Sequence, residues 1–242
     1  MNEKTYQHIL KSKRKSFAVL IDPDKYNIEV VKKANEANVN LLLVGGSLLS
    51  KGNIETCIKD IKKNSKIPVA IFPGNDLQIS GLADGILLLS LISGRNPDLL
   101  IGKHVIAAPQ LRASNLEIIP TGYMLIDSGK QTSALYMSNT NPIPYDKPDI
   151  AACTAMAGEM LGLKMIYMDA GSGAEKPVSE KMIQQVKKNI EIPLIVGGGI
   201  NSTLKAKMAC EAGADMIVIG NAAEKDSSLI KDIAKVVHSY KK

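Results

Sequence analysis

The 242-residue chain carries a formal net charge of +6 and contains 45% hydrophobic and 4% aromatic residues, with no tryptophan. Its lysines are scattered and lack interleaved aromatic residues. This pattern disfavours nucleic-acid binding and suits a basic surface that attracts small anions. The N-terminal segment lacks the apolar stretch of a signal peptide, and no apolar run approaches the roughly 18 residues of a membrane span. Cys57, Cys153 and Cys210 form no metal-ligand motif, so we expect a soluble, cytoplasmic protein.

Short apolar segments alternate with helical patterns along the chain. Their continuous hydrophobicity is typical of parallel strands that are covered on both faces. The expected strands are residues 17–21, 40–44, 69–72, 85–89, 118–126, 165–168, 193–196 and 216–219. Eight such units predict an α/β fold with one domain over residues 1–242, a (βα)8 TIM barrel rather than an open doubly wound sheet.

The third connection differs from the others. Residues 73–84 (PGNDLQISGLAD) include one proline and two glycines, and they are barely long enough for a crossover helix. We therefore expect the third helix to be missing or replaced by irregular chain. Such a gap would leave one flank of the barrel thinly covered.

Glycine-rich turn motifs occur at the C-terminal ends of the last three expected strands, at residues 167–173, 197–202 and 220–223. Glycines allow the backbone to approach an anion closely, and the helix that follows adds N–H donors. One interpretation is that they only form tight turns of the barrel. Three of them on consecutive late strands favour a phosphate site, which TIM barrels commonly build from the loops after strands seven and eight. Tyr167, Ser172 and Asn221 offer further hydrogen-bond donors.

The first expected strand ends in an acidic turn, Asp22-Pro23-Asp24, and the second ends in residues 44–47 (VGGS). Asp22 is explained either as a turn or cap residue or, together with Ser47 on the neighbouring strand, as a ligand of magnesium. Magnesium takes few protein oxygens and completes its shell with water and phosphate. Asp24 is expected to cap the next helix.

These motifs together resemble the geranylgeranylglyceryl phosphate synthase family, which includes bacterial heptaprenylglyceryl phosphate synthases. The matching words are IDPDK, VGGS, PTGYMLIDSG, YMDAGSGA, IVGGGI and VIGNAAE, which occur in this order over almost the whole chain. The resemblance implies a TIM barrel without a regular third helix. It also implies transfer of a polyprenyl group from its diphosphate to the 3-hydroxyl of sn-glycerol 1-phosphate, with release of diphosphate, in ether-lipid biosynthesis.

Site residues follow from the same resemblance. Asp22 and Ser47 would bind Mg²⁺, and Asp169 would accept the proton of the hydroxyl. The glycerol phosphate site would consist of Tyr167, Met168, Asp169, Ala170, Gly171, Ser172, Gly173, Gly198, Gly199, Gly220 and Asn221. An apolar trough for the prenyl tail is expected beside Leu77, Ile79 and Leu82. The expected partners are the two substrates and further copies of the chain, with contact to a membrane during release of the lipid product.

Two positions depart from the family pattern. Leu20 stands where one branch has lysine, which favours the geranylgeranyl donor over the heptaprenyl donor. Asp169 replaces the usual glutamate, and its shorter reach affects the assignment of the general base. The alternatives are a heptaprenylglyceryl phosphate synthase, a sugar-phosphate isomerase or flavin-dependent enzyme of the same fold, and a non-catalytic phosphate-binding module.

Overall fold

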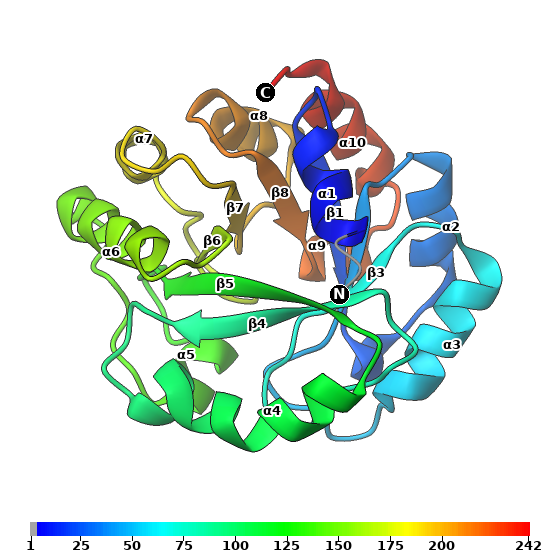
Figure 1. Ribbon diagram of the computed structural model, residues 1–242. Helices are drawn as coiled ribbons and strands as arrows, with labels where there is room; N and C mark the ends of the chain where they lie inside the picture. Colours follow the sequence, from blue (N-terminus) through cyan, green and yellow to red (C-terminus); the bar gives the residue numbers. More distant parts are fainter. Residues whose placement is uncertain (1–3) are drawn as a thin grey trace.

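Eight parallel strands form the centre of the protein. The computed structural model describes residues 4–242, and in it the strands pair in sequence order, with β1 also pairing with β8 (Figure 1). The sheet is therefore a closed barrel, and the predicted fold class is confirmed. The strands are β1 (Ser16–Ile21), β2 (Leu41–Val44), β3 (Val69–Ile71), β4 (Gly85–Leu91), β5 (Glu117–Leu125), β6 (Met165–Asp169), β7 (Leu194–Gly197) and β8 (Met216–Ile219).

Helices surround the barrel. They are α1 (Lys4–Lys11), α2 (Ile28–Glu36), α3 (Ile54–Asn64), α4 (Lys103–Ala113), α5 (Ser133–Ser138), α6 (Pro148–Met160), α7 (Glu180–Lys187), α8 (Thr203–Glu211), α9 (Asn221–Lys225) and α10 (Leu229–Ser239), with short turns η1 (Pro23–Lys25) and η2 (Asp98–Gly102). Asn53 caps α3 by accepting from the backbone N–H of Thr56. None of the helices in residues 4–242 is long and apolar enough to cross a bilayer.

The alternation of side chains along each strand creates two apolar layers. On β6, Met165 and Tyr167 point into the barrel, whereas Ile166 and Met168 pack between the strands and the outer helices. Both layers are built mainly from aliphatic side chains. The barrel interior is therefore a packed core rather than a channel.

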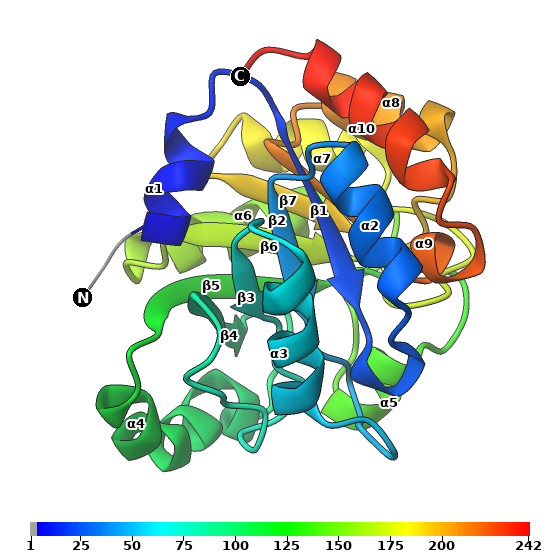
Figure 2. The ribbon, with the colours of Figure 1, turned by 90° about the vertical axis from the view of Figure 1, so that its right-hand side faces the viewer.

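Helix α1 closes the N-terminal end of the barrel (Figure 2). Ile9 is buried against the interior layer, and the backbone N–H groups of Thr5 and Tyr6 donate to the buried carboxylate of Glu117 on β5, at 2.6 and 3.1 Å. A carboxylate at the first turn of a helix satisfies N–H groups that have no partner within the helix. Ligands therefore have access from the opposite end, where the strands have their C-terminal ends.

Irregular chain connects β3 to β4, and residues 72–84 contain no helix, as predicted. The buried Gln78 fixes this segment, because its amide nitrogen donates to the Gly46 carbonyl at 2.9 Å and its oxygen accepts from the Gly74 N–H at 3.0 Å. The segment thus packs against the loop after β2 without a helix of its own.

Candidate active site

The loops after β6 and β7 lie against each other at the C-terminal end of the barrel. Gly171 and Gly198 both have φ in the left-handed region, at +88° and +78°. A Cβ on Gly198 would lie 2.6 Å from the backbone nitrogens of Ala170 and Gly171. Only glycine permits this approach, so the glycines expected to bind phosphate also join the two loops into one surface.

Beside Gly173 the surface opens. A Cβ at this position would face only the side-chain amide of Asn221 at 3.7 Å and the ammonium of Lys130 at 4.0 Å. Ser172 and Gly173 are exposed. Lys130 therefore adds a cation where the sequence analysis expected a phosphate, although that analysis did not name it. The position of Lys130 directly after the motif PTGYMLIDSG of the fifth strand is the sequence signal that could have identified it as a site residue.

Asp169 lies at the end of β6 with its carboxylate buried. One oxygen accepts from the Tyr123 hydroxyl at 2.6 Å, and the other accepts from the backbone N–H of Gly171 at 2.7 Å. Burial raises the pKa of the Asp169 carboxyl, and these two hydrogen bonds oppose that rise. Each oxygen keeps a second lone pair for a substrate hydroxyl. A carboxylate with a raised pKa is the stronger base.

Tyr123, which the sequence analysis did not assign a role, pairs in register with Tyr167 across β5 and β6. The rings of Phe72, Tyr123 and Tyr167 form a cluster with centroids 5.1 to 5.7 Å apart. Burial, and then the charge of Asp169, raise the pKa of Tyr123 well above its ordinary value. Its hydroxyl therefore stays protonated and acts as a donor.

Three of the expected binding residues are buried beneath the glycine loops. Tyr167 is 2% exposed and occupies the barrel interior, with its hydroxyl over Gly197. Met168 points outward into the layer beneath the helices, so its side chain does not face the site. Ala170 is also buried, and its N–H donates to the Gly197 carbonyl at 3.2 Å. Residues 172 and 173 are therefore the exposed members of the predicted set, and residues 198, 199, 220 and 221, which follow β7 and β8, are partly exposed.

The carboxylate of Asp22 lies beside the loop after β2. A Cβ on Gly46 would be 3.4 Å from Asp22 Oδ1, which also accepts from the Asp24 N–H at 3.0 Å. The other oxygen, Oδ2, contacts the Lys25 ammonium at 3.4 Å, and the side chain is 23% exposed. Asp22 is thus both a turn residue and an accessible carboxylate next to the Ser47 loop.

This arrangement fits a magnesium ion. A partly exposed carboxylate and a nearby hydroxyl are hard oxygen donors, and magnesium needs only one or two of these. Among residues 4–242 there is no cluster of three or more His, Cys, Asp or Glu side chains suited to a metal. An ion held by Asp22 and Ser47 would consequently take its other ligands from water and phosphate oxygens.

Asp24 does not cap the next helix, and that expectation was wrong. Asn27 caps α2 instead. The Asp24 carboxylate accepts from the hydroxyl and backbone N–H of Ser50, both at 2.8 Å, and from the N–H of Lys51 at 3.0 Å. These bonds hold its pKa well below the usual range. Asp24 therefore fastens the loop after β2, which carries Ser47, to the turn that carries Asp22.

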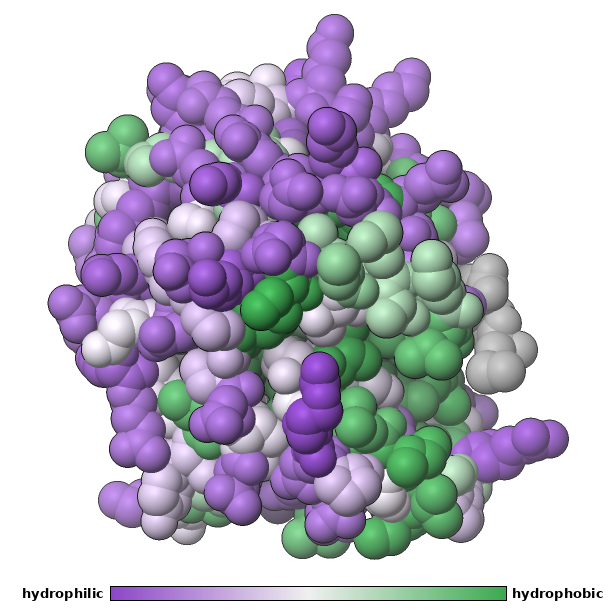
Figure 3. Space-filling model, turned by 90° about the vertical axis from the view of Figure 1, so that its left-hand side faces the viewer, coloured by the Kyte–Doolittle hydropathy of each residue, from purple (hydrophilic) through white to green (hydrophobic). Residues whose placement is uncertain are grey.

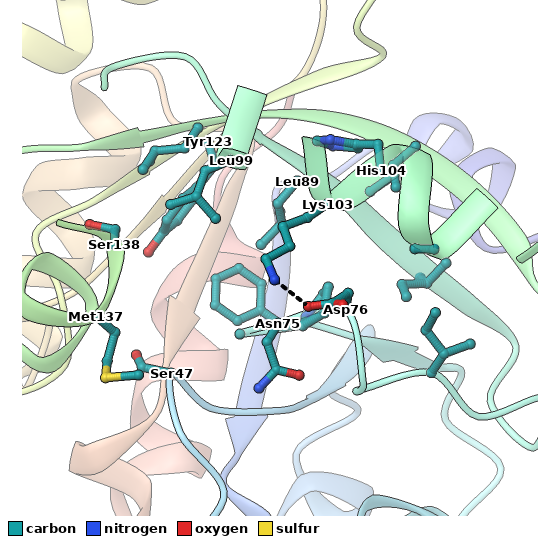
Figure 4. Close-up of a pocket in the computed structure, with 18 of the residues that line it drawn as sticks. Ser47, Asn75, Asp76, Leu89, Leu99, Lys103, His104, Tyr123, Met137 and Ser138 are labelled. Carbon is teal, nitrogen blue, oxygen red and sulfur yellow. Dashed lines mark ion pairs between the residues drawn. The ribbon is translucent and has the colours of Figure 1, made fainter. Parts of the chain in front are cut away.

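An apolar pocket lies beside the segment that replaces the third helix (Figure 4). Its lining includes Ser47 at one end, Phe72 and Ile79 of the irregular segment, and apolar side chains of β4, η2 and α4, namely Ile86, Leu88, Leu89, Leu91, Leu99, Ala107 and Leu111. Lys103 and Asp76 form an ion pair of 3.1 Å across it. The pocket is thus continuous with the loop that would hold the metal.

The expected trough is partly confirmed by this pocket. Ile79 lines it, but Leu77 and Leu82 do not, and Leu77 is 84% exposed. The N–H of Leu77 donates to the Asn75 side chain at 2.9 Å, in a turn that directs residue 77 outward. Further apolar lining comes from β4 and α4, which were not predicted from the sequence to contribute.

The fold and site together define a (βα)8-barrel protein with an incomplete helix ring and glycine loops after its last three strands. Residues 7–237 match the PcrB family. A protein of Chitinophaga pinensis named geranylgeranylglyceryl phosphate synthase is 52% identical, over 99% of this chain and 98% of its own length. A Spirosoma linguale protein of the same name is 55% identical, over 95% and 94%.

Solved structures of similar proteins point to the same family. The crystal structure of (S)-3-O-geranylgeranylglyceryl phosphate synthase from Thermoplasma acidophilum, in complex with its substrate sn-glycerol-1-phosphate, has a TM-score of 0.89 to this chain. The two are 31% identical over 98% of each. The enzyme from Thermoplasma volcanium has a TM-score of 0.90 at 35% identity, again over 98% of each chain. The chain therefore belongs to the PcrB family and is a relative of geranylgeranylglyceryl phosphate synthases, and the resemblance seen in the motifs is confirmed.

Proposed function

We propose that the protein transfers a geranylgeranyl group from its diphosphate to the 3-hydroxyl of sn-glycerol 1-phosphate. The observation that carries this proposal is the match over the whole chain to an enzyme crystallised with that acceptor, together with the glycine loops after β6, β7 and β8. No feature of the site favours an isomerase, a flavin enzyme or a binding module over this reaction.

The acceptor would bind at the glycine loops. Its phosphate would lie over residues 172, 173, 198, 199, 220 and 221, near the Lys130 ammonium, where backbone N–H groups and a cation meet. This placement leaves the glycerol end directed toward the buried carboxylate of Asp169.

The donor would occupy the apolar pocket, with its diphosphate at the end lined by Ser47 and its tail along β4 and α4. Magnesium held by Asp22 and Ser47 would, when bound, neutralise charge on the diphosphate leaving group. Hydrophobic burial of the tail supplies most of the donor affinity, because each methylene removed from water contributes about 0.8 kcal/mol.

At the first carbon of the prenyl chain, the reaction forms one bond and breaks one. The hydroxyl oxygen of glycerol phosphate bonds to the first carbon of the prenyl chain, while the bond from that carbon to the diphosphate oxygen breaks and its electron pair leaves with diphosphate. Asp169 accepts the hydroxyl proton, an effect typically worth about 10² to 10⁴ in rate. Tyr123 and the Gly171 N–H hold the carboxylate in position for this step.

One assay tests the proposal. The protein is incubated with sn-glycerol 1-phosphate, magnesium and prenyl diphosphates of increasing length, and the lipid product is identified by mass spectrometry. We expect an ether of the C20 donor, with the longer heptaprenyl donor used poorly. The absence of any ether product would exclude the proposed activity, and preference for the longer donor would exclude the assignment to geranylgeranyl.

We propose self-association through the face that carries α6. Ile150, Met160 and Leu161 are large hydrophobic residues on or next to this helix, and they are 45%, 84% and 78% exposed. Hydrophobic residues gather on this side of the molecule (Figure 3). Exposed apolar patches commonly mark interfaces. Light scattering after chromatography should give a multiple of the 26.0 kDa chain mass, reduced by Leu161→Asp.

A second exposed apolar group lies on α4 beside the pocket. Ile101, just before the helix, and Val105 and Ile106 within it are more than half exposed. We propose that this group contacts a membrane when the lipid product leaves, in a cytoplasmic location consistent with three unpaired cysteines. Co-sedimentation with vesicles tests this contact, and Val105→Asp should weaken it.

A further inference from the structure

The acceptor loop after β6 is held from the end of β8. In the orientation that satisfies its neighbours, the amide oxygen of Asn221 accepts from the Ser172 hydroxyl at 2.8 Å and from the Gly173 N–H at 3.2 Å. The amide nitrogen then donates to Glu224 Oε2 at 3.2 Å. In the reverse orientation the amide oxygen would face the carboxylate, an unfavourable contact. Glu224 and the Gly173 N–H thus together select which end of the Asn221 amide faces the loop.

Glu224 has a second partner. Its Oε2 lies 3.3 Å from the ammonium of Lys25, which also lies 3.4 Å from Oδ2 of Asp22. The Glu224 side chain is 16% exposed, whereas that of Lys25 is 54% exposed. The lysine is thus the counter-ion of this mostly buried carboxylate.

We propose that the Lys25–Glu224 pair is a positioning element, which fixes the amide of Asn221 and through it the shape of the Ser172–Gly173 loop. This inference rests on the proposed function, since the loop matters as the acceptor site. Neither residue touches the substrate in this assignment. They act through Asn221, and Lys25 additionally links the acceptor loop to the turn that carries Asp22.

The direction in which removal of Glu224 changes the affinity for glycerol phosphate distinguishes this proposal from simple charge repulsion. Glu224 is an anion near the site for another anion, so on charge alone its removal should tighten the binding of glycerol phosphate. If Glu224 instead orients Asn221, its removal should weaken binding, because the amide loses the acceptor that fixes its orientation. A hydrogen bond to a charged group of this kind corresponds to roughly tenfold in affinity.

The experiment measures the affinity for sn-glycerol 1-phosphate by calorimetry without divalent cation. We expect Glu224→Met, which has similar size but no acceptor, to bind about tenfold more weakly than the wild type. Glu224→Gln, which keeps an acceptor oxygen, should bind within about threefold of the wild type. Tighter binding by both variants would overturn the proposal in favour of charge repulsion.

A double-mutant cycle tests the role of Lys25. If Lys25 acts through Glu224, Lys25→Met weakens binding in the wild type and has little further effect in Glu224→Met. If its effect is the same in both backgrounds, Lys25 attracts the phosphate directly and the pairing is refuted. Lys33→Met and Glu36→Met provide the matched control, because these residues form an exposed ion pair of 2.8 Å on α2, and both should bind like the wild type.

Kinetics distinguish positioning from general damage. Glu224→Met should raise the KM for glycerol phosphate about tenfold and leave kcat at saturation within about twofold. A fall in kcat alone would contradict the proposal. Should Glu224→Met fail to fold, the half-exposed Lys25→Met carries the test, with Lys25→Arg expected to restore affinity. A wild-type protein that binds no glycerol phosphate would refute the proposed function itself, whereas wild-type binding that these variants leave unchanged refutes only the positioning role.

Discussion

The hydroxyl of Tyr123 donates a hydrogen bond of 2.6 Å to the carboxylate of Asp169, and both groups are buried at the C-terminal end of the barrel. This bond lowers the pKa of Asp169 against the larger effect of burial, which raises it. Tyr123 therefore keeps Asp169 ionised, and able to accept a proton, at lower pH than burial alone would allow.

Tyr123→Phe removes that bond and should raise the pKa of Asp169 further. Because the ionised carboxylate is the active form, the acidic limb of the profile of kcat/KM against pH should move to higher pH. Turnover at neutral pH should fall by about tenfold. The matched control is Tyr136→Phe, since Tyr136 is 72% exposed. An unchanged acidic limb would show that Tyr123 does not act on this carboxylate.

Asp169→Asn should increase the stability of the protein relative to the wild type as the pH rises, although it lowers activity. Burial gives Asp169 a folded-state pKa above its ordinary value of 3.8, so the folded state prefers the protonated form. The contribution of protonated Asp169 to the free energy of unfolding of the wild type is thus lost as the pH rises from about the ordinary pKa through the raised pKa. Asparagine does not ionise, so the free energy of unfolding of the variant relative to the wild type should increase over this pH range and then level off.

The same variant should lose about 10² to 10⁴ in kcat. Chemical denaturation at several pH values and steady-state kinetics provide the two measurements. A constant difference in stability across pH would mean that Asp169 has the same pKa in the folded and unfolded protein.

Asp22→Asn should abolish magnesium-dependent turnover, because the amide is a weak ligand for a hard divalent cation. Binding of glycerol phosphate should change little, since Asp22 lies between β1 and η1 and not at the loops after β6 and β7. Calorimetry with the acceptor and a magnesium titration of activity test both parts. Asp232→Asn, exposed on α10, is the control. Full activity of Asp22→Asn would remove Asp22 from the mechanism.

Gly198→Ala should destabilise the protein and eliminate acceptor binding. Alanine would have to adopt φ +78° and place its Cβ 2.6 Å from two backbone nitrogens. We expect a cost of roughly 2 to 3 kcal/mol. Gly162→Ala is matched in backbone strain, with φ +84°, but nothing lies within 4 Å of its Cβ. It should cost only about 1 kcal/mol and leave binding intact. Equal effects of the two substitutions would contradict the close contact between the loops.

Ala107→Phe should shorten the donor that the enzyme prefers. Ala107 is 8% exposed and lines the apolar pocket from α4, so a phenyl ring there would block part of the path for the tail. We expect the ratio of kcat/KM for C20 to that for C15 diphosphate to fall by about tenfold or more. Ala108→Phe, on the exposed side of the same helix, should leave the ratio unchanged. An equal ratio for both variants would place the tail elsewhere.

The sequence by itself determined the barrel and its irregular flank. Continuous apolar segments need cover on both faces, and residues 73–84 hold proline and glycines where a helix would need a regular apolar stripe. Sequence also located the glycine loops, because positive φ and close backbone approach restrict the residue type at positions such as Gly171 and Gly198.

Only the tertiary structure decided which side chains meet. Barrel closure and strand register bring Tyr123 to Asp169, 46 residues apart, and Lys25 to Glu224, 199 residues apart. The same packing turns Met168 away from the site and brings side chains of β4 and α4 into the pocket. Such contacts depend on how several helices and strands are placed relative to one another. Hydrophobic pattern and turn chemistry specify each element separately, so they do not predict these contacts.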